Sequence, residues 1–399
     1  MTPHLRVEVL QDRRQVVAAR AALEDLCHEL CEPNIFYEPW FLFPALEHLA
    51  SDERFQFLCL YEQGGRQRLC GFVPLIEGRL HPLLPLMTYE VWAHSQCFRC
   101  TPLVRRGFAG PFWHAVLSWL EGQPWHCRLL HLHRLPAEGE LWDSLRSALE
   151  ERPSLRALLY RFDSAFLRTG RSYDETLSRS MSKSTRRKLA QQRRRLSERG
   201  KLAFTDLDGS AAVDGAIEEF LRIEASGWKG RAGTALASNR KVAAFYRDVM
   251  RAACDQGRLT FLSLRLDGRA IATQCTILAP PGAFHFKCAY DESYRQFSPG
   301  ILLEMESVHR MHDPDDPLRS GLTWCDSCAG PEDGPDYRCW PQRRPIARYR
   351  ITTGWTPHAV ALALWPLGRR LLGRGSQDAG RPRGRSTSGR RHSVIARPS

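Results

Sequence analysis

The stretch FHFKCAYDESYRQFSPGILLEMESVHRM spans Phe284–Met311 and carries the strongest fold signal in the chain. A β-rich run ends near Tyr290, a polar loop follows, and Ser298, Pro299 and Gly300 open an apolar helix. The first N–H groups of a helix have no partner within it, and the helix dipole adds partial positive charge there. Pro suits the first helical turn, and Gly lets a ligand approach the backbone. The pattern therefore predicts a phosphate site; the alternative is an ordinary strand–loop–helix connection.

The strands predicted ahead of this loop form a meander. Leu259–Leu266 and Ala270–Leu278 are β-rich runs joined by Asp267-Gly268, which tolerates the positive φ of a type I′ hairpin turn. Ala283–Tyr290 is the third run. Two helices precede the meander, and a helix and a strand follow it: Ala212–Ala225, Arg240–Cys254, Ile301–Met311 and Leu322–Cys325. The first half of the chain repeats a weaker order of helix, helix, hairpin, helix and strand, which predicts an internal duplication.

Motif spacing in the second half matches a known pattern. Arg295, Ser298 and Gly300 follow a pyrophosphate motif in which Arg or Gln precedes Gly by three positions and a second Gly or Ala by five. Ser298 replaces the first Gly of that motif. Three further segments add to the pattern: Ser182–Arg194, Glu224–Gly230 and Phe286–Glu292. Over residues 172–350 the chain resembles the GNAT superfamily of N-acyltransferases, in particular its CelD-type (cellulose-biosynthesis) and Fem-like branches.

The resemblance implies an α/β (α+β) fold of two tandem GNAT-like units, each a mixed, mostly antiparallel sheet flanked by helices. The units would be a degenerate one at 1–165 and an acyltransferase at 166–355, followed at 356–399 by an apolar segment and an Arg-rich tail. The donor, acetyl-CoA or another acyl-CoA, would lie in a V-shaped opening between two central strands, and no metal is expected. Its binding residues would be Arg187, Arg295, Gln296, Phe297, Ser298, Pro299, Gly300 and Ile301.

The catalytic candidates follow from what acyl transfer requires. Backbone donors polarise the thioester carbonyl, and a base takes a proton from the incoming amine. We expect three carboxylates as base candidates, two tyrosines as acid candidates and a lysine that orients an acidic acceptor: Glu224, Asp291, Asp326, Tyr290, Tyr337 and Lys287. For each, the alternative is a structural ion pair or a surface role. The resemblance implies an amine acceptor, either a small molecule or a saccharide, in envelope or polysaccharide assembly.

The net charge of +13 is concentrated in two segments. Lys183–Lys201 carries +8 on a predicted helix, Ser180–Arg199, that ends at Gly200. Arg369–Ser399 carries another +8 on an Arg-, Gly-, Ser- and Pro-rich tail that is predicted to be disordered, so the remainder sums to −3. The helix would contact the phosphates of coenzyme A, an anionic acceptor or RNA. Its alternative is a solvated face.

Two other functions stay open. A Fem-like aminoacyltransferase would take its acyl group from aminoacyl-tRNA, and both basic segments would suit RNA. A non-catalytic GNAT-derived scaffold would use the same segments to bind RNA or an acidic membrane surface. In that case Val360–Leu372 would be a short interfacial helix.

Cysteine content and hydropathy predict a cytoplasmic protein, with peripheral membrane contact through the C-terminal segment as an option. The chain has 13 Cys and no secretory signal, which favours free thiols in a reducing compartment. The two CxxC pairs, Cys97/Cys100 and Cys325/Cys328, are read as buried small residues, with a zinc site as the alternative. Ala359–Leu367 is about half of the ~20 residues needed to span a bilayer. The aromatics between Phe36 and Trp125 would form either a carbohydrate platform or a core.

Overall fold

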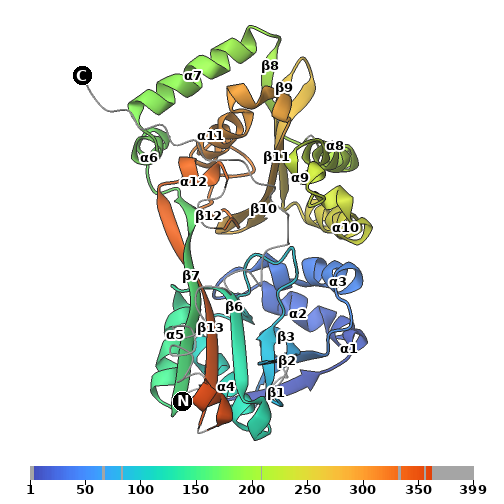
Figure 1. Cartoon of the computed structure of the whole chain (residues 1–399), viewed down its shortest axis with the longest axis vertical. Helices are drawn as coiled ribbons and strands as arrows, with labels where there is room; N and C mark the ends of the chain where they lie inside the picture. The colour runs from blue at the N-terminus through green and yellow to red at the C-terminus, as the bar shows by residue number, and fades with distance from the viewer. Residues whose placement is uncertain are drawn as a thin grey trace, which may run out of the picture. The chain divides into compact units, whose positions relative to one another are not determined.

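The computed structural model describes residues 4–64, 68–81, 84–207, 209–330, 334–354 and 356–361 (Figure 1). The predicted Arg-rich tail and most of the apolar segment before it, from residue 362 onward, lie outside the described residues. Among those residues, no helix is both long and apolar enough to cross a membrane.

The first half of the chain alternates strands with helices that cover them. Its elements are β1 (Leu5–Leu10), α1 (Arg13–Ala18), α2 (Arg20–Cys27), η1 (Ile35–Tyr37), α3 (Pro39–His48), β2 (Phe55–Glu62), β3 (Leu69–Arg79), β4 (Met87–Val91), β5 (Leu103–Val104), α4 (Ala109–Glu121), η2 (Trp125–Cys127), β6 (Leu129–Pro136), α5 (Glu140–Glu150) and β7 (Ser154–Arg168).

The second half adds two helices before it repeats this order. Its elements are α6 (Tyr173–Ser180), α7 (Lys183–Ser197), β8 (Leu202–Thr205), η3 (Ser210–Ala212), α8 (Val213–Ser226), α9 (Trp228–Arg231), η4 (Leu236–Ser238), α10 (Arg240–Asp255), β9 (Leu259–Leu266), β10 (Arg269–Ala279), β11 (Gly282–Tyr290), η5 (Glu292–Phe297), α11 (Pro299–Met311), β12 (Trp324–Asp326), α12 (Asp336–Cys339) and β13 (Gln342–Thr353).

The two halves share one topology. In the first, β1, β2, β3 and β4 pair antiparallel in sequence order, and β6 then pairs parallel with β4. In the second, β8, β9, β10 and β11 do the same, and β12 pairs parallel with β11. A helix, α4 or α11, precedes the parallel strand in each half, as a parallel crossover requires. This repeated strand order is the structural form of the predicted duplication.

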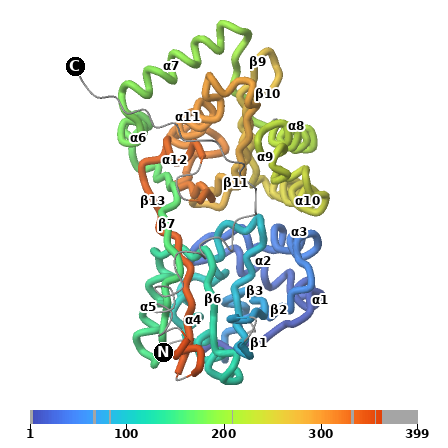
Figure 2. Tube along the Cα trace, in the orientation of Figure 1, coloured from blue at the N-terminus to red at the C-terminus, as the bar shows by residue number. Residues whose placement is uncertain are grey.

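The halves are joined by an exchange of strands. β7 leaves the first half and pairs with β12 of the second, whereas β13 leaves the second half and pairs with β6 of the first. The two exchanged strands also pair with each other, antiparallel, from Gln342↔Phe166 to Thr353↔Ser154. Figure 2 shows the two strands running side by side. The result is one 13-stranded mixed sheet in the order β1-β2-β3-β4-β6-β13-β7-β12-β11-β10-β9-β8, with β5 beside β3.

The sequence-based prediction missed four strands, β4, β5, β8 and β13, and the predicted helix Ser180–Arg199 is shorter, at Lys183–Ser197. The helix starts later because the Ser182 side chain accepts a hydrogen bond from the Thr185 amide and so caps it. β13 is rich in arginine, which masks the apolar alternation of a strand. The predicted boundary between 165 and 166 falls inside β7, a strand that serves both halves.

Aromatic side chains fill the core at the junction of the halves. The Phe36 ring meets the Phe284 ring edge-on with centroids 5.6 Å apart, and Phe41 does the same with Phe245 at 5.3 Å. Edge-to-face pairs of this kind add roughly 0.5–1.5 kcal/mol beyond the area they bury. Most of the first-half aromatics that might have formed a carbohydrate platform are thus interior, although Trp125 is exposed.

Candidate functional site

The predicted donor site is a turn between η5 and α11. Asp291 caps η5 by accepting a hydrogen bond from the Ser293 amide. Ser298 then adopts the left-handed conformation, with φ 54° and ψ 48°, and α11 begins at Pro299. Ser298, which stands where the family motif has its first Gly, thus adopts a backbone conformation that costs least for Gly.

The amides of this turn are partly used by the turn itself. The Ser298 amide donates to the Arg295 carbonyl at 3.1 Å, and the Ile301 amide donates to the Ser298 carbonyl at 3.0 Å. No side chain caps the start of α11. Within the described residues the Gly300 amide makes no hydrogen bond, and Gly300 is half-buried beside the Tyr290 ring. One main-chain donor at a helix start therefore remains available for an anion.

The basic helix α7 lies against this turn. The Gln192 side-chain amide donates to the Gln296 carbonyl at 2.8 Å, and the Arg199 guanidinium stacks 4.7 Å from the centroid of the buried Phe297 ring. Arg187 and Arg295 are exposed. The turn and the cationic helix, about a hundred residues apart in sequence, thus form one positively charged surface.

The strand that leads into the turn parts from its neighbour. β12 pairs with β11 only from Gly282↔Trp324 to Phe284↔Asp326, whereas β11 continues to Tyr290. The β10–β11 register shifts where Cys275 faces Lys287 and Thr276 faces His285, which leaves Phe286 as the extra residue of a bulge. A strand that loses its neighbour on one side leaves backbone groups on that side for other partners, as the V-shaped opening requires.

Lys287 lies on β11 beyond the last residue paired with β12. Its ammonium nitrogen is 4.8 Å from the centroid of the Phe98 ring and 5.5 Å from that of Phe286. Burial, with the nearby Lys229 charge, lowers the pKa of Lys287 to about 8, although the Glu224 carboxylate opposes this. Lys287 forms no ion pair with any residue that the structure describes. A lysine in these surroundings can lose its proton near neutral pH.

The predicted base Glu224 is buried on α8 with both carboxylate oxygens engaged. One oxygen accepts from the Lys229 ammonium at 2.9 Å, and the other accepts from the Leu236 amide at 2.8 Å. These contacts hold α8, α9 and η4 together. Its role as a base stays a prediction, because a proton acceptor would first have to release one of these partners.

The other predicted groups are spread over two places. Asp291 pairs with Arg269 at 2.9 Å near the turn, and its bonds from Ser293 outweigh burial and lower its pKa. Tyr290 is exposed, and its ring lies beside Gly300.

Asp326 is fully buried at the end of β12, where the Arg99 charge outweighs burial and lowers its pKa. Tyr337, the second acid candidate, lies under the Arg343 guanidinium. Tyr290, Asp291 and Gly300 lie together at the turn. Asp326 lies away from them, beside Phe284 of β11.

Two clusters that the sequence-based reading did not single out could hold a metal ion. They are Glu90, His131 and His133, and His285, Glu304 and Asp336. A His-x-His alternation on a strand was the available signal for the first, since residues i and i+2 share a face. In the described part of the chain, the cysteines of the two CxxC pairs do not join such a cluster; Cys97 Sγ and Cys100 Sγ lie 3.7 Å apart in the core.

A separate cleft of about 420 Å³ lies between the β8–β9 edge and α8. It is lined by Asp206, Glu219 and Arg265, among others, and shares no residue with the predicted donor turn. The Arg265 guanidinium and the Glu219 carboxylate neutralise each other there at 2.7 Å. We therefore assign the cleft no part in donor binding.

Comparison with known proteins identifies the fold. Residues 183–337 match the family model described as acetyltransferase (GNAT) domain, which spans the turn, β9–β12 and the basic helix. The second half of the chain thus resembles a GNAT domain. A crystal structure of FemX shares this fold with a TM-score of 0.52 at 10% identity, covering 91% of this chain and 100% of that one.

Two further solved structures resemble this GNAT-type chain more loosely. One is the C-terminal domain of a putative lysylphosphatidylglycerol synthetase from Agrobacterium fabrum, with a TM-score of 0.49 at 13% identity, over 88% of this chain and 96% of that one. The other is a tandem GNAT protein from the clavulanic acid biosynthesis pathway, with a TM-score of 0.40 at 12% identity, over 88% and 100%. Both TM-scores are below 0.5, so neither structure adds to the fold assignment. No curated protein matches the chain significantly.

Proposed function

We propose that the second half transfers an acyl group from an acyl-CoA donor to an amine, with the donor phosphates at the start of α11. The observation that carries the proposal is the open Gly300 amide at an uncapped helix start, flanked by the cationic helix α7. Backbone N–H groups at a helix N-terminus, together with the helix dipole, favour phosphate. The exposed Arg187 and Arg295 add the charge that a pyrophosphate needs.

The backbone of β11 and the side chains on it would have separate roles in the reaction. The amine nitrogen attacks the thioester carbonyl carbon, a C–N bond forms, and the C–S bond breaks to release the coenzyme A thiolate. Backbone donors on the parted edge of β11 would stabilise the oxyanion. The neutral Lys287 amine would accept the proton that the nucleophile loses, because the predicted carboxylates already have partners. The thiolate takes its own proton from solvent or from Tyr290.

The acceptor proposed is a small-molecule or saccharide amine, as in envelope or polysaccharide assembly of the CelD-type branch. Support for this part is the family resemblance alone. The N-terminal half contributes Phe98 to the surroundings of Lys287, so it would shape the acceptor side of the site.

A thermal-shift experiment tests donor binding. Coenzyme A and acetyl-CoA should each raise the melting temperature, because a ligand that binds only the folded state stabilises it. Gly300→Ala is the permissive variant: its added Cβ would lie 3.4 Å from Tyr290 Cδ1, an ordinary contact, and Ala favours the helix by about 1 kcal/mol. Because the pyrophosphate motif accepts either Gly or Ala at this position, the variant should fold at least as stably as the native chain and keep most of the ligand shift.

Two controls sharpen that result. Gly300→Val places more bulk at the same point and should abolish the shift, whereas Gly330→Ala, at an open position away from the turn, should leave it unchanged. If coenzyme A stabilises the native chain and Gly300→Val equally, the phosphates bind elsewhere. If neither coenzyme A nor acetyl-CoA shifts the native chain, the acyl-CoA proposal fails.

The second candidate is a Fem-like transfer from aminoacyl-tRNA. It is favoured by the fold shared with FemX and by α7, on which Arg193, Arg194 and Arg195 are exposed. A long polyanion would use this helix through its backbone phosphates, with affinity that falls steeply as salt rises. A salt-sensitive shift with tRNA and none with coenzyme A would favour this candidate over the first.

A further inference from the structure

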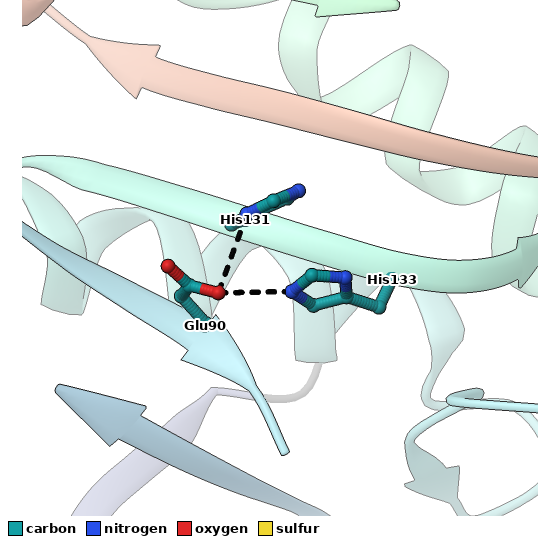
Figure 3. Close-up of side chains that lie close together, drawn as sticks. All are labelled: Glu90, His131 and His133. Carbon is teal, nitrogen blue, oxygen red and sulfur yellow. Dashed lines mark hydrogen bonds and ion pairs between the residues drawn. The ribbon is translucent and has the colours of Figure 1, made fainter. Parts of the chain in front are cut away.

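The parting of β4 and β6 in the first half is the topological counterpart of the parting of β11 and β12. The two strands pair parallel only at Tyr89↔Leu130 and Glu90↔His131. His133 lies two residues further along β6, on the same face as His131, where β4 has ended. Three side chains with metal-ligand chemistry thus converge where the strands separate, and Figure 3 shows both imidazoles turned toward the carboxylate.

The spacing of these ligand atoms suits a small metal ion. Glu90 Oε2 lies 3.4 Å from His131 Nδ1 and 3.0 Å from His133 Nε2, and the two imidazole rings are tilted by 34° with centroids 3.9 Å apart. Zinc bonds of about 2.0–2.1 Å in tetrahedral geometry place neighbouring ligand atoms roughly 3.3 Å apart. The present distances therefore leave space for a shared ion with little movement.

One of the two imidazoles, that of His131, is buried and lacks hydrogen bonds to the described residues. The His131 side chain is 6% exposed, and neither of its ring nitrogens has a hydrogen-bond partner among the described residues. A buried imidazole nitrogen with no such partner costs free energy, which a metal bond would remove. The Glu90 and His133 side chains are more open, at 24% and 15%, so an ion can enter from their side.

We propose that Glu90, His131 and His133 form a binding site for a single divalent transition-metal ion of the zinc class. Two nitrogen ligands and one oxygen ligand suit zinc, cobalt or iron(II), and a three-residue set leaves a coordination position open for water or an anionic ligand. Three arginines, Arg134, Arg348 and Arg350, are close enough to act on the imidazoles electrostatically. Their charges oppose a bare dication and favour an anion in the open position.

The second cluster is better explained as a buried ion network. His285 Nδ1 lies 2.8 Å from Asp336 Oδ1 and 3.4 Å from Glu304 Oε2, while the Trp340 indole donates to the other Glu304 oxygen at 2.6 Å. The three side chains are 3%, 6% and 0% exposed, so an ion has no open side from which to enter. A protonated His285 between two carboxyl groups accounts for this arrangement without metal.

Cobalt titration of the chelator-treated full chain tests the proposal. We expect one equivalent of Co²⁺ to produce visible ligand-field absorption without the near-ultraviolet thiolate charge-transfer band, and Zn²⁺ to displace it. Glu90→Gln and His133→Gln should each weaken binding at least tenfold, and the double variant should abolish it. His114→Gln, at a partly exposed histidine paired with Glu151, is the matched control and should bind normally.

Several outcomes would overturn the site. One is the absence of saturable cobalt binding to a chain that circular dichroism shows to be folded. Another is unchanged binding in Glu90→Gln, a variant of nearly the same shape that keeps the hydrogen-bonding surface of the site. A third is a thiolate charge-transfer band, which would place the ion on cysteines such as Cys97 and Cys100. Because the readout is metal binding, none of these results depends on acyltransferase activity.

Discussion

Arg99 and Asp326 form a bidentate ion pair inside the protein, with Nε to Oδ2 at 2.9 Å and Nη2 to Oδ1 at 2.5 Å. Arg99 comes from the segment between β4 and β5 of the first half, and Asp326 ends β12 of the second. Their side chains are 3% and 0% exposed. The pair therefore joins the two halves near the point where β11 and β12 part, and it gives Asp326 a structural reason to be charged and buried.

Breaking this pair should destabilise the fold strongly. Removal of Arg99 leaves the buried Asp326 carboxylate with only its longer ion pair to Arg344, at 3.5 Å, and the loss of a buried partner costs about 3–5 kcal/mol. Arg99→Met should lower the free energy of unfolding by that amount in urea denaturation. The double variant Arg99→Met/Asp326→Leu should lose less than Arg99→Met alone, since neither charge remains. If the double variant is the less stable of the two, the pair is not the cause of the loss.

The pKa of Lys287 should determine the rising limb of the pH–rate profile. A base must be neutral to accept a proton, and Lys287 becomes neutral as the pH rises through its pKa of about 8. We expect kcat/KM to rise with pH and level off above about 8. Lys287→Arg, which stays protonated, should lose about 10²–10⁴-fold in kcat/KM. Rates of wild type and variant are compared with the same donor and acceptor.

Lys229 offers an independent check on the same limb. The Lys229 charge is one cause of the lowered pKa of Lys287, so Lys229→Met removes that repulsion. The same variant frees the Glu224 carboxylate, which favours protonated Lys287. Both effects raise the pKa of Lys287, and the limb should move to higher pH. A limb that stays in place would exclude Lys287 as the titrating group.

The His285–Glu304–Asp336 network should make stability fall as the pH rises. Burial followed by the Asp336 charge raises the pKa of Glu304 to about 8. For His285 the two carboxylates overcome burial and raise the pKa to about 9. A pKa raised in the folded state gives stability that is complete below the unfolded pKa and is lost as the pH passes the folded pKa. For Glu304 the loss runs from about pH 4.5 to 8, and for His285 from about 6.5 to 9.

Glu304→Gln isolates the first of these two losses. The amide mimics the protonated carboxyl and can still accept the hydrogen bond from the Trp340 indole. We expect the variant to gain stability over the native chain as the pH rises, by on the order of 5 kcal/mol near pH 9. Urea denaturation at several pH values measures this difference. A constant difference across the range would contradict the raised pKa of Glu304.

Ser298 should be replaceable by Gly and by little else. A residue with a Cβ pays roughly 1 kcal/mol for the left-handed conformation that Ser298 adopts, whereas Gly does not. Ser298→Gly should therefore keep or slightly raise the melting temperature and retain coenzyme A binding. Ser298→Val, with a branched Cβ, should lose about 1–2 kcal/mol. Equal stability of the two variants would mean that the turn relaxes out of this conformation.

Local chemistry made much of the second half predictable from sequence. Asp267 and Gly268 take the positive φ values, 49° and 80°, that the β9–β10 hairpin requires. The apolar run after Pro299 forms α11 as expected, and Ser298 just before it takes the left-handed conformation that ends η5. Each of these features depends on residues within a few positions of one another, so the sequence alone determines them.

Tertiary structure decided what depends on distant partners. The exchange of β7 and β13 is hidden from the sequence, because a strand's pattern records its faces and not the neighbour on its edge. For the same reason the sequence allowed Asp326 to be proposed as a base, because its ion pair with Arg99, 227 positions away, appears only in the tertiary structure. The convergence of Glu90 with His131 and His133 likewise exists only because the end of β4 pairs in parallel with the start of β6 in the sheet.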